Sequence, residues 1–108
     1  MDVQYTPEAA DEINRIDDEE DIRLGDALER VLDEIEDPER PVERIGALMP
    51  AGEPPLYAPV KSRMKLVPLV DARHDQYAVI FTQDRPGRRR VIYIGKMPPP
   101  EGSLQPSS

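Results

Sequence analysis

The spacing of apolar residues changes once along this chain, and that change limits what the chain can fold into. Apolar residues recur every three or four positions between residues 7 and 36, and every second position between residues 61 and 95. The first spacing is typical of amphipathic helices and the second of half-buried strands. We therefore predict an α+β domain in which helices precede a sheet.

A strand and two helices are predicted in the first third of the chain. Val3 and Tyr5 alternate with polar residues, which indicates a short strand that must join a larger sheet. Thr6 followed by Pro7 predicts a helix start, because threonine caps orphan N–H groups and proline suits the first helical position. The second helix should end before Pro38, since a residue before proline avoids the α conformation. Its apolar stripe consists of Leu24, Leu28, Val31, Leu32 and Ile35.

A three-stranded antiparallel meander is predicted in the second half, over residues 61–70, 76–83 and 88–95. Pro68 favours a place at the sheet edge, or a bulge, for the first of these strands. Pro86 and Gly87 suit the two central positions of a type II turn between the other two. The last strand is apolar on both faces over residues 91–94, so we expect it inside the sheet with the N-terminal strand beside it. Residues 38–60 carry six prolines and should form a loop with one short helix from Pro41.

The domain is expected to span residues 1–96 and to be followed by a disordered, proline-rich tail over residues 97–108. The chain has 0 Cys, which excludes disulfides and cysteine metal sites and fits a reducing compartment. We see no signal peptide and no apolar run of about 18 residues, so we expect a cytoplasmic protein without a membrane partner. No phosphate-binding loop, metal-ligand spacing or catalytic triad is visible, and no cofactor is expected.

Charge divides the chain into two unlike parts. Residues 1–44 hold 17 acidic and 5 basic residues (5 − 17 = −12), and residues 45–108 hold 5 acidic and 9 basic residues (9 − 5 = +4). Such asymmetry indicates separate faces with separate partners. The plainer interpretation is that the acidic residues are solvated helix faces, which is what we expect of the run at residues 17–21.

Four short segments in this order resemble the RelE/ParE toxin superfamily. They are Val-Gln-Tyr-Thr-Pro-Glu-Ala at residues 3–9, Leu-Glu-Arg-Val-Leu at 28–32, Tyr-Ala-Val-Ile-Phe at 77–81 and Val-Ile-Tyr-Ile-Gly-Lys at 91–96. The resemblance implies a toxin-like protein of a bacterial type II toxin–antitoxin system, held inactive by a cognate antitoxin. RelE-like members cut mRNA on the ribosome, whereas ParE-like members inhibit DNA gyrase and are not nucleases.

Metal-free RNA cleavage needs a base for the ribose 2′-hydroxyl, cations for the transition state and an acid for the leaving oxygen. Lys61, Arg63 and Lys65 alternate along one predicted strand, so they should share a face and could bind phosphate. The resemblance adds Lys96, at a position where the family has His or Lys. His74 is the only histidine and could serve as acid or base if its turn folds over the cationic strand.

Two positions depart from the nuclease pattern that the resemblance implies. Ala78 stands where many members have Arg, and residues 97–100 are Met-Pro-Pro-Pro where nucleases continue with Arg and a catalytic Tyr. A weakened ribonuclease and a ParE-like gyrase inhibitor therefore both remain open. So does a non-catalytic binding module that keeps the fold without the toxicity, and, more remotely, an acidic helical-hairpin adaptor. We expect the arginines at residues 88–90, at the predicted turn, to be solvated charges.

Overall fold

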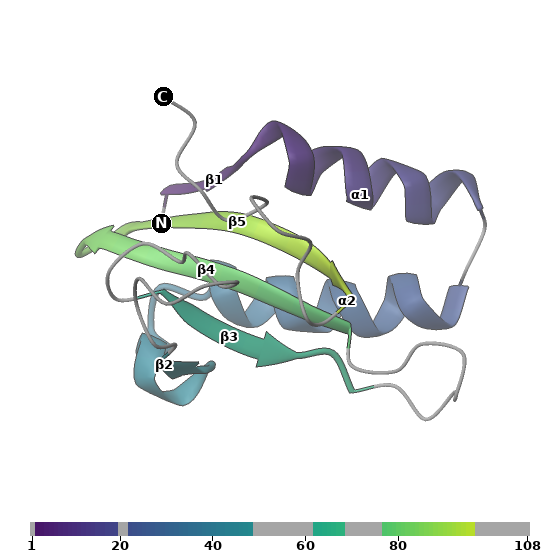
Figure 1. The fold of residues 1–108 in the computed structure, drawn as a ribbon. Helices are drawn as coiled ribbons and strands as arrows, with labels where there is room; N and C mark the ends of the chain where they lie inside the picture. Colours follow the sequence, from purple (N-terminus) through teal and green to yellow (C-terminus); the bar gives the residue numbers. More distant parts are fainter. Residues whose placement is uncertain (1, 20–21, 49–61, 69–76, 97–108) are drawn as a thin grey trace.

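The computed structural model of the protein describes residues 2–19, 22–48, 62–68 and 77–96 (Figure 1). Within these residues a mixed sheet of five strands, in the order β1-β5-β4-β3-β2, packs against two helices. The predicted α+β class is confirmed. In chain order the elements are β1 (Asp2–Tyr5), α1 (Pro7–Asp18), α2 (Ile22–Glu36), the 3-10 helix η1 (Val42–Arg44), β2 (Ala47–Leu48), β3 (Arg63–Leu66), β4 (Tyr77–Arg85) and β5 (Arg88–Lys96).

The start of α1 is fixed as its sequence predicts. The Thr6 hydroxyl accepts a hydrogen bond from the backbone N–H of Ala9 at 3.2 Å, and Pro7 occupies the first helical position. The same hydroxyl lies 3.3 Å from the carbonyl oxygen of Ile92, to which it donates. The N–H of Thr6 donates to the carbonyl of Val91 at 3.0 Å. The capping residue therefore also joins α1 to β5.

The antiparallel part of the sheet follows the predicted order. β3 pairs with β4 and β4 with β5, both antiparallel, while β1 pairs with β5 in parallel. The β4–β5 connection is Pro86–Gly87, and Gly87 has a φ of 83°, as the second central position of a type II turn requires. β5 thus lies between β1 and β4, which confirms the interior position that its two apolar faces predicted (Figure 1).

Two details of the sheet differ from the prediction. Of the two alternatives that Pro68 favours, the edge position is not found, because the two-residue strand β2 pairs with β3 at Ala47 and Leu48, and β3 ends at Leu66, before the proline. The short helix after Pro41 is a single 3-10 turn that ends at Arg44, and the chain then enters β2. The predicted tail at residues 97–108 and most of the predicted loop lie outside the described residues.

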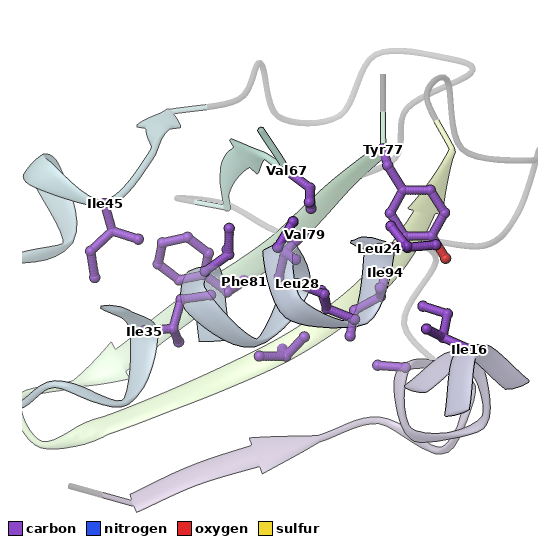
Figure 2. Close-up of a cluster of buried hydrophobic side chains, with 14 residues drawn as sticks. Ile16, Leu24, Leu28, Ile35, Ile45, Val67, Tyr77, Val79, Phe81 and Ile94 are labelled. Atoms are coloured by element: carbon purple, nitrogen blue, oxygen red, sulfur yellow. The ribbon is translucent and has the colours of Figure 1, made fainter. Parts of the chain in front are cut away.

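The core lies between the helices and one face of the sheet. Tyr77, Val79 and Phe81 of β4 point to this face and are each no more than 1% exposed. They pack with Leu28 and Ile35 of α2 and with other residues of the same cluster (Figure 2). The remaining buried members of the cluster are Ala9, Ile16, Leu24, Ala27, Val31, Ile45, Val67, Val91 and Ile94.

Candidate functional site

The register of β3 places two of the predicted cations on one face of the sheet. Arg63 lies opposite Phe81, and Lys65 lies opposite Val79. Directly opposed residues of an antiparallel pair share a face, and both partners belong to the core. The two cations therefore extend from the helix-bearing face, and both are half-buried. This register puts Arg63 and Lys65 on one face, the face that carries the helices.

Arg63 has a structural partner. Its Nη1 donates to the backbone carbonyl of Gly46 at 3.1 Å. The chain at Gly46 approaches β3 so closely that a Cβ there would lie 2.6 Å from the carbonyl oxygen of Met64. Only glycine permits this approach without a shift of the backbone. Arg63 therefore stabilises the contact between the η1–β2 segment and β3, and its charge is directed at a backbone carbonyl.

Lys96 is exposed at the end of β5, opposite Tyr77 of β4. Strands in a sheet are about 4.8 Å apart, so β5 and β3 are separated by about 10 Å with β4 between them. Lys96 and Lys65 thus stand on the same face, on either side of buried β4 residues. Lys61 and His74 lie outside the described residues. Among the described residues, the structure brings Arg63 and Lys65 together and leaves Lys96 apart.

Ala78, at the position where the resemblance implies an arginine, is fully buried. It lies opposite Leu66 on one side and Gly95 on the other, on the face away from the helices. On β5, the side chain of Tyr93 lies over Gly95. A Cβ built on Gly95 would be 2.6 Å from the Tyr93 hydroxyl oxygen, so glycine leaves the space that this side chain fills. That hydroxyl donates to the carbonyl of Lys96 at 2.7 Å and so fixes the end of β5.

A polar cluster that sequence reasoning missed joins α1 to the start of β4. The Tyr77 hydroxyl donates to the Glu12 carboxylate, and the same carboxylate oxygen accepts from Nε of Arg15 at 2.9 Å. Burial opposes the ionisation of Glu12, but the hydrogen bonds from Arg15 and Tyr77 outweigh it and lower the pKa of Glu12. Burial raises the pKa of Tyr77, and the hydrogen bond to Glu12 and the charge of Glu12 raise it further. Tyr77 is therefore a protonated donor at neutral pH and holds α1 on the sheet.

Arg89 is a residue that the sequence prediction placed wrongly. We expected a solvated turn charge, but Arg89 is 3% exposed and points towards the end of α2. Its guanidinium donates to the carbonyls of Ile35 at 2.7 Å, of Asp37 at 3.1 Å and of Arg40, and to Oε1 of Gln83 at 3.0 Å. Burial lowers the pKa of Arg89, although Asp37 and Glu43 act against this. Ile35 lies in the last turn of α2, so Arg89 satisfies one of the carbonyls that the helix end leaves without a partner, and it also binds the chain just after the helix.

Comparison of this chain with family models, with curated proteins and with solved structures gives no match. Within the described residues, His, Cys, Asp and Glu form no group of three or more that could hold a metal ion. Among the described helices, none has the length and apolar character needed to cross a membrane.

Proposed function

We propose that this chain is a toxin-like protein of the RelE/ParE superfamily, partnered with a cognate antitoxin, and that it acts by binding a protein target such as DNA gyrase. The observation that carries the proposal is the arrangement of elements. A strand and a two-helix hairpin precede an antiparallel β3–β4–β5 unit, and the first strand returns beside β5. This is the order in which the four family-like segments occur in the sequence.

Binding is favoured over RNA cleavage by how the basic side chains are used. Arg63 donates to the Gly46 carbonyl, and Arg89 donates to three carbonyls at the end of α2. The Arg89 guanidinium is therefore not positioned to receive a phosphate, and Nη1 of Arg63 is directed at a carbonyl. Ala78 supplies no charge at the arginine position of the family pattern.

A weakened ribonuclease is the second candidate, and the shared face of Arg63 and Lys65 favours it. Lys96, and also Lys61 and His74 outside the described residues, would complete its set of basic groups. A third candidate keeps the fold and the partner binding without any toxicity.

Induced expression in bacteria separates the three candidates. Growth arrest with intact mRNA and blocked supercoiling is the expected result. Arrest with cleaved mRNA would instead support the ribonuclease, and normal growth would support the binding module without toxicity. Either of these outcomes would overturn the proposal of a gyrase-type target.

A double variant, Lys65→Ala with Lys96→Ala, tests the chemistry without touching the Arg63 and Arg89 contacts. Cleavage through phosphate-binding cations predicts that this variant no longer cuts mRNA. A protein-binding mode predicts that mRNA stays intact with and without the substitutions. Arg85→Ala with Arg90→Ala removes the same charge from exposed positions near the β4–β5 turn and is the matched control. Thermal unfolding of each variant verifies that the fold is retained.

A further inference from the structure

A groove runs between the two helices of the hairpin, α1 and α2. Its volume is about 600 Å³. Its apolar lining comes from both helices, and Ile22, at the start of α2, is 73% exposed. The described residues that line it are Ile13, Ile16, Asp17, Ile22, Gly25, Asp26, Leu28, Glu29 and Leu32.

Gly25 keeps the middle of this groove open. It lies within α2, and a Cβ built on it would have its nearest neighbour, Cγ2 of Ile16, at 3.8 Å. That is an ordinary van der Waals distance, so the packing of α1 on α2 does not require glycine. A larger side chain at this position would instead occupy the groove.

The charge along the groove has one sign. The charged residues among its described lining are Asp17, Asp26 and Glu29, all acidic. The helices around it are acidic as well, since α1 has one basic and five acidic residues (1 − 5 = −4) and α2 has two basic and five acidic residues (2 − 5 = −3). An apolar floor with acidic edges fits an apolar stripe flanked by cations.

The length of the groove matches a short helix. Its lining on α2 runs from Ile22 to Leu32, which is eleven residues and, over the ten rises between them, about 15 Å at the rise of an α-helix. Helices that dock into such grooves present apolar residues at i, i+3, i+4 and i+7, which takes about two to three turns. A second copy of this chain is a poor occupant, because a two-fold interface would bring two acidic hairpins together.

We propose that the α1–α2 groove binds an amphipathic helix of a partner protein, with its apolar stripe on the groove floor and lysine or arginine beside the acidic edges. The site lies on the helical hairpin and does not depend on the function proposed above. If the chain proved to have no effect on gyrase or mRNA, the groove could still bind a helix. If the groove bound no helix, an effect on gyrase or mRNA would still stand.

The test uses the full chain and two synthetic helical peptides of about 15 residues. Both carry the same leucine stripe; one has lysine at the flanking positions and the other has glutamate. Fluorescence anisotropy measures the affinity of each. The lysine peptide should bind at least tenfold more tightly than the glutamate peptide, and the difference should shrink as salt is raised, because salt screens exposed charges.

Two kinds of variant locate the site. Gly25→Leu fills the groove and should weaken binding at least tenfold, whereas Gly25→Ala adds one methyl group and should change it less than threefold. Neutralising the edges with Asp17→Asn, Asp26→Asn and Glu29→Gln should also weaken binding at least tenfold. The matched control removes three charges from exposed positions of α1 outside the groove lining, with Glu8→Gln, Asp11→Asn and Asp18→Asn.

Each alternative outcome overturns the proposal. One is equal binding of the two peptides, and another is no binding of the lysine peptide at about 1 mM, the limit of weak specific affinity. Unchanged affinity in both Gly25→Leu and the edge variant would place the contact elsewhere. Concentration-dependent dimerisation that Gly25→Leu abolishes would make a second copy the occupant. Circular dichroism must show native helix content for each variant, and the edge variant decides the matter if Gly25→Leu misfolds.

Discussion

Replacing Arg89 with methionine should remove more stability than any nearby surface substitution. Methionine keeps much of the apolar stem but removes every donor. The carbonyls of Ile35, Asp37 and Arg40 would then lose the guanidinium that now binds all three. Because the side chain is 3% exposed, water cannot simply take its place.

The magnitude follows from two opposing effects. Leaving a buried carbonyl without a donor costs about 1–3 kcal/mol. The carbonyls of Ile35 and Arg40 lose the guanidinium, whereas that of Asp37 keeps the N–H of Arg40 as a donor, so one or two carbonyls are affected. Methionine also relieves the unfavourable burial of a cation, the same burial that lowers the pKa of Arg89, and this offsets part of the loss. We expect a net loss of about 2–4 kcal/mol in the free energy of unfolding. For a domain of this size, that lowers Tm by about 10–25 °C.

Urea unfolding followed by far-UV circular dichroism measures the change. The slope of the free energy with urea should stay constant, because the surface exposed on unfolding is the same. Arg90→Met is the matched control, since Arg90 is the exposed neighbour and should change stability by less than about 0.5 kcal/mol. Arg89→Lys should fall between the two, because an ammonium lacks the planar fork of donors. If Arg89→Met and Arg90→Met differ by less than about 1 kcal/mol, Arg89 does not stabilise the end of α2.

Three further substitutions test other parts of the fold. Gly25→Ala should raise the free energy of unfolding by about 0.5–1 kcal/mol, because the methyl group fits and alanine favours the helix; unchanged or lower stability in urea unfolding would contradict this. Gly46→Ala should lower it by about 1–3 kcal/mol, because its Cβ would press on the Met64 backbone, and full stability would exclude that close approach. Glu12→Gln should cost about 1–2 kcal/mol near neutral pH. The folded protein lowers the pKa of Glu12, so this contribution is complete above the ordinary value of 4.5 and is lost as pH falls through the lowered pKa. The stability difference from wild type should therefore shrink in acid, and a difference independent of pH would refute the role of the Glu12 charge.

Local sequence signals predicted the parts of the fold that depend on neighbours in the chain. The Thr6–Pro7 helix start, the end of α2 before Pro38 and the positive φ of Gly87 all follow from steric rules within a few residues. The shared face of alternate residues in β4 follows from the period of a strand.

The alternation of faces every second residue is interrupted in β5, where the pairing register with β4 shifts. Ile80 pairs with Tyr93 and Phe81 pairs with Val91, so Ile92 is an extra residue in its strand. A strict period of two would put Val91 and Tyr93 on the same face. The bulge instead directs Val91 and Ile94 to the core. Nothing in the apolar run at residues 91–94 distinguishes these alternatives, because every residue in it is apolar or aromatic.

The polar clusters were also beyond local prediction, for a related reason. The Glu12–Arg15 pair has the spacing of neighbours on a helix, but Tyr77 joins it from 65 residues away. Arg89 reaches carbonyls 49 to 54 residues away. Arginine beside a turn is usually solvated. Arg89 is buried here because the end of α2 packs beside it and offers carbonyl acceptors.

These contacts change how the charge of the chain should be interpreted. The nine basic residues of the second half give it a positive net charge, yet Arg63 and Arg89 are directed at backbone carbonyls. Loss of function after substitution of either residue would therefore report on folding before it reports on a phosphate contact. Substitution of Lys65 and Lys96 is therefore the sharper test of whether the chain cleaves RNA. The acidic residues of the first half also fall into two groups. Glu12 binds the Tyr77 hydroxyl, whereas Asp17, Asp26 and Glu29 at the groove edge are exposed. Net charge alone would treat all of these groups as equivalent, whereas their contacts assign some to stability and leave others for partners.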